Sequence, residues 1–392
     1  MDYDLPQETE EFRKVVRSFA EEVVRPVAEH YDARSEFPLD VVRQMGELGL
    51  FGLVLPERYG GSDAEFITLC VVIEELARVD SSVAITLSAA VGLGAMPFLL
   101  FGREDQKQTW LPPMAAGEVL GAFGLTEASG GSDVAALRTV ATRDGEEWVI
   151  DGSKAFITNA GTPLSRVVTV AAITGRSEGG KEMSSIAVAH GTPGFSVGRE
   201  YRKLGWRASD TRELVFEACR VPVTNLVGEQ GSGYRNFLTI LDGGRIAIGA
   251  LAVGLAQGCL DESLRYAGQR TAFGREIGAY QAVQFKLADM ATKIAAARDQ
   301  IYKAAWLRQQ GRRYKAVASM AKLFASEVAM ECAREAVQIH GGYGYIEEFP
   351  VARHFRDAKI LEIGEGTSEV QRMLIARELG LPGAVPGSQT NQ

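Results

Sequence analysis

A glutamate between two glycines is the residue of this 392-residue chain best suited to proton transfer. Glu365 lies between Gly364 and Gly366, and such small neighbours let another molecule's backbone or thioester approach the carboxylate closely. A carboxyl group that is drawn out of water has a raised pKa and can accept a proton. Taken alone, the segment is more often a solvated loop, so a general base here is a hypothesis that depends on the rest of the chain.

The residues after Glu365 predict a helix. Thr367 and Ser368 are residue types found at helix N-caps, and the carboxylate of Glu369 suits the positive end of a helix. We therefore expect the glutamate on a turn that leads directly into a helix.

A second candidate is the Gly/Ser-rich segment GAFGLTEASGGSD, residues 121–133. The turn from Ser129 to Ser132, which contains Gly131, can direct several backbone N–H groups toward an anion or the polar edge of a ring. The hydroxyls of Thr126 and Ser132 add donors. The alternative is an ordinary turn.

The segment KAFITNAG offers an aromatic ring and a hydroxyl on one surface. Strand alternation places Phe156 and Thr158 together, opposite Ile157, and this suits a flat aromatic ligand. Ordinary cross-strand packing is the alternative.

Two further segments carry groups suited to a phosphate-bearing ligand. Arg270 could clamp a diphosphate, Phe273 could stack and Gln281 could hydrogen-bond, while Gln338 and Gly341-Gly342 form a helix end that a ligand can approach. A salt bridge, a core ring and a helix C-cap are the alternatives.

Asp242 and Arg245 lie three residues apart, at the expected start of a helix, and so on one of its faces. They could contact a ligand together, or they could form an ordinary intrahelical pair.

The composition limits the class of protein. An apolar fraction of 46% with 23% charged residues is typical of a soluble globular chain, and the net charge of −8 argues against nucleic-acid binding. The four cysteines form no CxxC pair and indicate a reduced, cytoplasmic setting. With four histidines and no HExxH motif we expect no metal site. The acidic, polar start predicts neither a signal nor a transit peptide.

The periodicity of apolar residues predicts three regions that position these groups. Residues 1–120 and 233–380 read as helical, residues 121–232 as short strands, and residues 381–392 as a flexible tail. We expect a helix to end at Pro112-Pro113, and hairpin turns at Asp144-Gly145 and Asp151-Gly152. Residues 81–101 are uncharged, and we interpret them as a buried core helix rather than a membrane span. The fold class is α+β, mainly α, with an antiparallel, barrel-like sheet and a helical bundle.

Seven segments in register resemble the acyl-CoA dehydrogenase family, most closely its short-chain, butyryl-type branch. The resemblance covers residues 5–380 and is carried by RSFAEEVVRP (17–26), FPLDVVRQMGELGLFGLVLPERYGG (37–61), LTEASGGSD (125–133), KAFITNA (154–160), RTAFGREIGAYQAVQFKLADM (270–290), QIHGGYGY (338–345) and RDAKILEIGEGTSEVQRMLIAR (356–377).

The resemblance implies a fold of N-terminal helices, a middle β-domain and a C-terminal four-helix bundle. It also implies that FAD binds between the β-domain and the bundle. The residues that would contact the flavin part are Phe123, Leu125, Thr126, Gly131, Ser132, Phe156, Ile157, Thr158, Thr367 and Glu369. Those that would hold the adenosine diphosphate part of a neighbouring subunit's FAD, in a homotetramer, are Arg270, Phe273, Gln281, Gln338, Gly341 and Gly342. The acyl-CoA would contact Ser132, Asp242, Arg245 and Gly366.

The reaction implied is removal of the α-proton of an acyl-CoA by Glu365, with transfer of the β-hydride to flavin N5 and release of a trans-2-enoyl-CoA. An electron-transfer flavoprotein would then take the electrons. Some family members carry the base at the position of Gly244, and glycine there leaves Glu365 as the candidate.

Several departures from the family pattern bear on the substrate. Gly364 replaces a common tyrosine, which either widens the cleft near the acyl Cα–Cβ or leaves room for another side chain, and a branched or bulkier acyl group is compatible with this change. Phe156 replaces a tryptophan, and Ala128 and Gly130 replace a proline and an alanine. Rival hypotheses are the same chemistry on a carrier-protein-bound thioester, an oxygen-using flavin enzyme, and a non-enzymatic assembly or membrane-associated protein.

Overall fold

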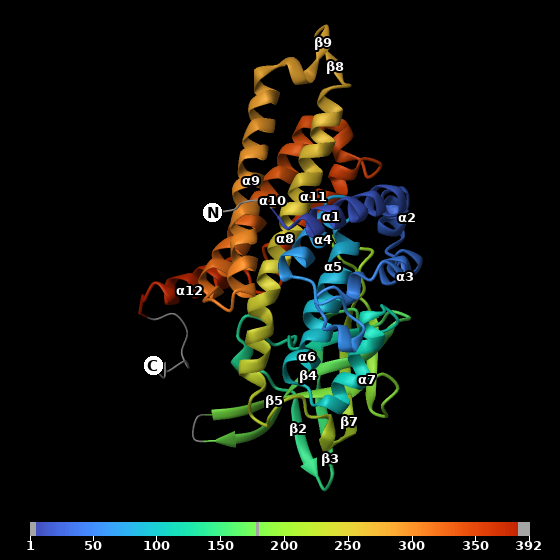
Figure 1. Cartoon of the computed structure of the whole chain (residues 1–392), viewed down its shortest axis with the longest axis vertical. Helices are drawn as coiled ribbons and strands as arrows, with labels where there is room; N and C mark the ends of the chain where they lie inside the picture. Colours follow the sequence, from blue (N-terminus) through green and yellow to red (C-terminus); the bar gives the residue numbers. More distant parts are fainter. Residues whose placement is uncertain (1–4, 178–179, 383–392) are drawn as a thin grey trace.

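Three groups of elements follow one another along the chain in the computed structural model, which describes residues 5–177 and 180–382 (Figure 1). Helices come first, a curled sheet lies at one end of the molecule, and a bundle of long helices runs from the sheet to the opposite end. The predicted order of helices, strands and helices is confirmed. We propose 1–120, 121–232 and 233–380 as the domain limits. Of the expected tail 381–392, residues 383–392 lie outside the described residues.

The N-terminal group is a helical layer. Its α-helices are α1 (Gln7–Phe19), α2 (Arg25–Arg34), α3 (Leu39–Glu47), α4 (Phe66–Ala77), α5 (Ser81–Ala89), α6 (Met96–Phe101) and α7 (Glu104–Ala115). Short π-helical turns at Ala20–Val24 and Ala90–Ala95 join α1 to α2 and α5 to α6. The second turn contains Gly94, where a Cβ atom would lie 2.7 Å from the carbonyl oxygen of Gly121, so glycine permits this close backbone approach.

The uncharged stretch 81–101 is buried inside the protein. Two helical stretches, 81–101 and 233–267, are long and apolar enough to cross a membrane, yet 78% and 83% of their most apolar windows are buried. Such burial is expected of core helices in a soluble protein.

The helix predicted to end at Pro112-Pro113 includes both prolines and continues to Ala115, so that prediction was wrong. Leu111 and Met114 are buried in the core, and their packing holds the last turn although the two prolines donate no backbone hydrogen bond. Tertiary burial here outweighs the local signal.

The middle group forms a seven-stranded sheet. Its strands are β1 (Leu120–Gly124), β2 (Val140–Asp144), β3 (Glu147–Thr158), β4 (Ser165–Ser177), β5 (Gly180–Ala189), β6 (Phe195–Glu200) and β7 (Thr211–Pro222). The strand order is β1-β4-β2-β3-β7-β6, with β5 on β4. Pairing is mostly antiparallel, but β4 runs parallel to β1 and to β2.

The hairpin turn expected at Asp151-Gly152 is instead a bulge within β3. Gly152 has φ of +148°, and a Cβ atom there would lie 2.6 Å from Thr139 Oγ1. The glycine therefore serves a close approach between strands, whereas Asp144-Gly145 does join β2 to β3.

The C-terminal group is a helical bundle. Its helices are α8 (Gly233–Ala267), α9 (Gln281–Gln309), α10 (Lys315–His340), α11 (Pro350–Leu361) and α12 (Ser368–Glu378). A small hairpin of β8 (Thr271–Ala272) and β9 (Arg275–Glu276) joins α8 to α9 at the end farthest from the sheet (Figure 1). The bundle helices share a core with the N-terminal helices, while the sheet has a core of its own.

Because α8 begins at Gly233, Asp242 and Arg245 lie in its interior rather than at a helix start, which corrects the prediction. The pair of glycines between them is tolerated because this part of the helix is buried on several sides, so neighbouring segments rather than intrinsic propensity hold it helical.

Buried polar contacts join the sheet to the helices. The side-chain amide of Asn159 donates to the carbonyl of Thr86, 3.0 Å away. The backbone N–H of Trp206 and the hydroxyl of Ser81 both donate to the carboxylate of Asp357, at 2.7 Å each. These bonds fix the sheet against α5 and α11. They therefore also fix the geometry of any site that is built from the sheet and these helices together.

Candidate active site

The turn after α11 carries Glu365 in a strained backbone conformation. Glu365 has φ of +52° and Gly366 has φ of +97°, so two successive residues are left-handed. The backbone N–H of Ser368 donates to the carbonyl of Glu362 and closes the turn. The predicted start of α12 is confirmed, since Thr367 is its N-cap and its hydroxyl accepts from the N–H of Val370. A non-glycine residue with positive φ often marks a functional site.

Two side chains from outside the turn hold its carbonyl groups. Gln371 Nε2 donates to the carbonyls of Glu365 and Gly366, at 3.2 and 3.0 Å. Lys322 Nζ, from α10, donates to the carbonyl of Gly366 at 2.8 Å. The sequence predictions missed both residues. The available signal was a lysine at an inward position of α10, between the buried Ala321 and Ala325.

The carboxylate of Glu365 lies against Gly244 of α8. A Cβ atom at position 244 would lie 1.9 Å from Glu365 Oε2, so only glycine leaves room for the carboxylate in this position. The residue is partly buried overall, but Oε2 itself is buried and has no hydrogen-bond partner among the described residues. Burial raises the pKa of Glu365 to about 7, although Lys322 and Arg245 act in the opposite direction. Such a carboxyl group is suited to general-base work near neutral pH.

Asp242 and Arg245 form a buried ion pair within α8, one turn of helix from each other. Lys315 Nζ adds a second contact to Asp242, at 2.9 Å. The ordinary intrahelical ion pair, which was the alternative to a ligand contact, is therefore present in the structure. Arg245 Nε remains buried without a partner among the described residues, and its charge acts on Glu365, so Arg245 also belongs to the electrostatic surroundings of the carboxylate.

A buried ion pair holds the Gly/Ser-rich loop to the sheet. Lys154 Nζ donates to Glu127 Oε1 at 2.8 Å, and Glu127 also accepts from the hydroxyl and N–H of Thr139. Burial pushes the pKa of Glu127 upward, but the hydrogen bonds from Lys154 and Thr139 outweigh this and lower it to about 2. Glu127 is thus ionised at neutral pH, and the loop is anchored at its base.

The anchored loop and the segment after the β3 bulge lie side by side. The N–H of Ala155 donates to the carbonyl of Thr126 at 2.9 Å. Of the predicted ligand-binding residues in this loop, Phe123 and Leu125 are buried, Thr126 is partly buried, and Gly131 and Ser132 are exposed. The hydroxyl of Ser132 is therefore open to a ligand, while the side chain of Phe123 packs on Phe237 with ring centroids 4.4 Å apart.

Phe156 presents its ring to solvent. Its side chain is 64% exposed, its φ is +61°, and its ring packs beside that of Tyr201 at 5.2 Å. Thr158 is partly buried, whereas the side chain of Ile157 points into the core of the sheet. A ligand can therefore reach Phe156 and Thr158 by their side chains but Ile157 only by its backbone.

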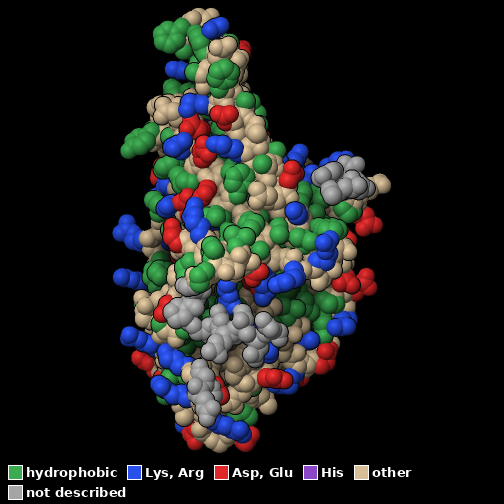
Figure 2. Space-filling model, turned by 90° about the vertical axis from the view of Figure 1, so that its left-hand side faces the viewer, with side chains coloured by type: hydrophobic (Ala, Val, Ile, Leu, Met, Phe, Trp, Pro, Cys, Tyr) green, Lys and Arg blue, Asp and Glu red, His purple; other side chains and the backbone are tan. Residues whose placement is uncertain are grey.

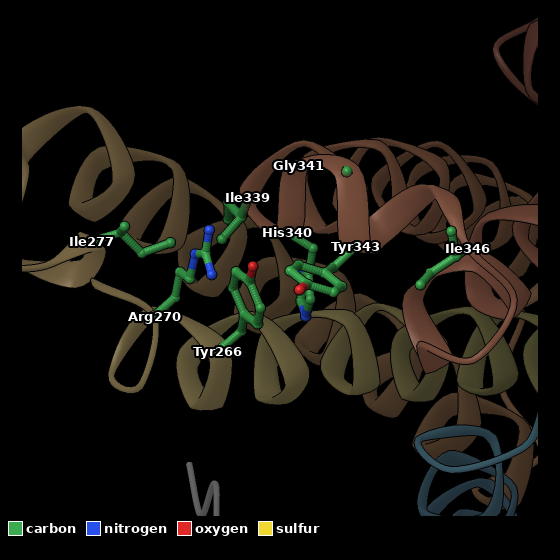
Figure 3. A pocket seen from close by; sticks show the side chains of 9 residues that line it. Tyr266, Arg270, Ile277, Ile339, His340, Gly341, Tyr343 and Ile346 are labelled. Carbon is green, nitrogen blue, oxygen red and sulfur yellow. The ribbon is translucent and has the colours of Figure 1, made fainter. Parts of the chain in front are cut away.

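A pocket of about 550 Å³ lies between the end of α8 and the end of α10 (Figure 3). Arg270 and Tyr266 enter it from one side and Gly341 borders the other, and Gly342 also belongs to its lining. Tyr343 lies with its ring centroid 5.7 Å from the Arg270 guanidinium carbon. A guanidinium, aromatic rings and glycine backbone in one hollow suit a ligand that combines phosphate with a heterocycle.

The structure brings only part of the predicted phosphate-binding set into this pocket. Phe273 is 97% exposed at the tip of the β8–β9 hairpin, Gln281 is exposed at the start of α9, and Gln338 is exposed on the last turn of α10. These three side chains do not line the pocket. They could meet a ligand only from the outer surface of this subunit.

Comparison with known proteins gives three family matches that together cover most of the chain. The N-terminal domain of acyl-CoA dehydrogenases matches residues 6–118, the middle domain matches residues 122–219 and the C-terminal domain matches residues 231–380. A probable acyl-CoA dehydrogenase of Bacillus subtilis, YngJ, is 48% identical over 97% of this chain and 100% of that protein.

Solved structures agree. Butyryl-CoA dehydrogenase from Megasphaera elsdenii superposes with a TM-score of 0.94 at 42% identity, covering 97% of this chain and 100% of that one. A chain in a structure described as an electron transferring flavoprotein of Acidaminococcus fermentans superposes with a TM-score of 0.94 at 43% identity, covering 97% and 99%. This chain therefore belongs to the acyl-CoA dehydrogenase family of FAD-dependent oxidoreductases.

Proposed function

We propose that this acyl-CoA dehydrogenase converts a short, medium or branched acyl-CoA to the trans-2-enoyl-CoA, with Glu365 as the acceptor of the α-proton. The observation that carries the proposal is the buried carboxylate of Glu365, held against Gly244 on a strained turn. A base must be desolvated enough to have a pKa near the working pH, and burial raises that of Glu365 to about 7.

The turn also supports the stabilisation of negative charge. As the α-proton leaves, charge develops on the thioester oxygen, which needs fixed hydrogen-bond donors. In the family one such donor is the backbone N–H of the catalytic glutamate. Here Gln371 holds the carbonyls of Glu365 and Gly366, which follow this N–H in the chain, so the turn that carries the N–H is braced before substrate binds. The competing carboxylate of Glu362 is paired with Lys359.

FAD, when bound, supplies the redox chemistry by accepting the β-hydride. The residues that we propose for its flavin part fit a planar polar ring, because exposed Phe156 and open Ser132 belong to two segments joined by the Ala155–Thr126 hydrogen bond. The Arg270 pocket suits the adenosine diphosphate part, whose two phosphates need a cation and backbone N–H groups. Thr367 and Glu369, at the start of α12, are proposed to complete the flavin contact.

We further propose that the enzyme is a cytoplasmic homotetramer that passes its electrons to an electron-transfer flavoprotein. Hydrophobic side chains stand out at the tip of the arm that carries the β8–β9 hairpin (Figure 2), and Phe273 is almost fully exposed there. A group of exposed hydrophobic side chains, unlike a single one, often marks a surface that contacts another protein. The position of this group supports the family arrangement in which this hairpin and Gln281, Gln338 and the Arg270 pocket meet the FAD of a neighbouring subunit.

A panel of thioesters tests the function and its substrate class. A Cβ atom at Gly364 would have one neighbour within 4 Å, the carbonyl oxygen of Ile360 at 3.4 Å. The protein therefore has room for a side chain at this position, and glycine leaves that room free. We expect anaerobic bleaching of the bound flavin by acyl-CoA esters, with branched esters oxidised at least as fast as straight ones of equal length. No bleaching by any CoA ester, together with bleaching by the same acyl groups on a carrier protein, would favour the alternative substrate.

Arg270→Ala should weaken FAD retention more than acyl-CoA binding. Loss of a charge-assisted contact to a diphosphate is expected to raise the FAD dissociation constant by about tenfold or more. Flavin release during gel filtration, and titration of the apoenzyme with FAD, measure the effect. Arg143→Ala is the matched control, since Arg143 is exposed on β2 of the sheet and does not line the pocket. Equal flavin loss in both variants, or weaker acyl-CoA binding alone, would contradict the assignment.

A further inference from the structure

Lys322 is a fully buried lysine that has no role in the reaction as proposed above. It lies on the inner face of α10 with none of its surface exposed, between the buried Ala321 and Ala325. A buried ammonium group costs free energy unless nearby groups compensate for it. Burial accordingly lowers the pKa of Lys322 to about 8, so the side chain is mostly charged at neutral pH.

The ammonium group is directed at the turn that carries Glu365. Lys322 Nζ donates to the carbonyl of Gly366 at 2.8 Å, in the residue directly after the glutamate. Gly366 has positive φ, and a Cβ atom there would lie 2.7 Å from Gln371 Nε2. The turn is therefore clamped from two sides, by Lys322 from α10 and by Gln371 from α12.

The charges around Glu365 show why Lys322 matters most. Arg245 on α8 is neutralised by Asp242, which also pairs with Lys315 of α10. Lys322 instead donates to an uncharged carbonyl, so its charge remains available to the glutamate. Glu365 is its strongest attractive neighbour, ahead of Glu362, which follows α11, and Glu369 on α12, while Arg245 repels it.

We propose that Lys322 is a positioning residue for Glu365, one that fixes the turn through the Gly366 carbonyl and keeps the carboxylate ionised and ready to accept a proton. This inference rests on the proposed role of Glu365. It assigns two separable effects to one side chain. The hydrogen bond holds the turn and thereby the position of the carboxylate, and the positive charge offsets the tendency of a buried carboxyl group to stay protonated.

Three substitutions at position 322 separate these effects. Lys322→Met removes the charge and the donor but keeps the apolar stem, Lys322→Gln keeps a donor without charge, and Lys322→Arg keeps both. Lys322→Met should slow anaerobic flavin reduction at pH 7 by about tenfold or more, and should move the midpoint of its pH profile upward by about one unit. Lys322→Gln should show the same shift with a smaller loss of the limiting rate at high pH. Lys322→Arg should return the midpoint to that of the wild type.

Infrared titration gives a second readout that does not depend on turnover. The band of the protonated Glu365 carboxyl, identified by its absence in Glu365→Gln, should persist to higher pH in Lys322→Met than in the wild type. Val328→Ala is the control for packing, because Val328 is buried on the same helix and carries no charge. It should lower the melting temperature without moving either midpoint.

The outcomes are distinct. A lower melting temperature with unmoved midpoints in Lys322→Met and Lys322→Gln would make Lys322 structural only and overturn the inference. Failure of Lys322→Arg to restore the midpoint would overturn the role of the charge. If Lys322→Met does not fold, Lys322→Gln gives the same titration. Near-normal flavin reduction by Glu365→Gln would instead overturn the proposed base itself. That outcome is measured on a different variant, so it is distinguishable from a failure of the inference about Lys322.

Discussion

Glu365→Gln should bind FAD and acyl-CoA much as the wild type does and yet lose flavin reduction by several orders of magnitude, as expected when an essential base is removed. The substitution keeps the shape of the side chain, so the turn and its contacts with Gln371 and Lys322 can persist. What disappears is the ability to accept the α-proton. Single-turnover reduction under anaerobic conditions, with acyl-CoA affinity measured in parallel, separates the chemical step from binding.

Glu362→Gln is the matched control. Glu362 lies in the same turn, but its carboxylate is paired with Lys359 rather than held against Gly244. We expect this variant to reduce its flavin at close to the wild-type rate. Near-normal reduction by Glu365→Gln, or an equal loss in Glu362→Gln, would place the base elsewhere.

The same carboxylate predicts how rate and stability depend on pH. Only the ionised form accepts a proton, so wild-type flavin reduction should rise as the pH passes through about 7 and level off above it. The free energy of unfolding depends on pH in the opposite direction. The folded state holds this proton more tightly than the unfolded state, so stability should fall as the pH rises from the ordinary glutamate pKa toward about 7. Glu365→Gln should remove this term and melt higher than the wild type at pH 8.

Local signals in the sequence predicted the features that short segments determine. The cap at Thr367, the turn at Asp144-Gly145 and the burial of residues 81–101 each follow from neighbouring residue types, and each is present. A local signal failed where distant packing decided the outcome. Pro112 did not end α7 because Leu111 and Met114 hold its last turn in the core.

The parts of the site that the sequence left hidden depend on contacts between distant segments. Nothing near Lys322 indicates that its ammonium group meets the carbonyl of Gly366, because α10 and the turn after α11 are brought together only by the bundle. The motif containing Arg270 predicted a phosphate clamp but not which of its companions share the pocket. Phe273, Gln281 and Gln338 point elsewhere in the single chain, as a site completed by another subunit would require.

Gly244→Ala should slow flavin reduction by about a hundredfold while leaving the fold intact, since a base displaced by about 1 Å can lose this much rate. The added methyl group would lie 1.9 Å from Glu365 Oε2, and this clash is relieved when the flexible glutamate side chain turns away. Alanine is also the better helix former, so α8 should become no less stable. Gly244→Ala therefore keeps the carboxylate but changes its position, whereas Glu365→Gln keeps the position but removes the carboxylate.

The measurement is anaerobic flavin reduction together with the melting temperature. Gly268→Ala is the control, because it makes the same exchange at the end of α8, where the added Cβ atom would meet its nearest neighbour at an ordinary 3.6 Å. We expect the control to match the wild type in rate, and Gly244→Ala to be slow but equally stable. A fast Gly244→Ala variant would mean that the working position of the carboxylate lies away from α8. A slow variant that also melts early would mean that α8 itself had shifted, and glycine would then be required at position 244 for packing rather than to make room for the base.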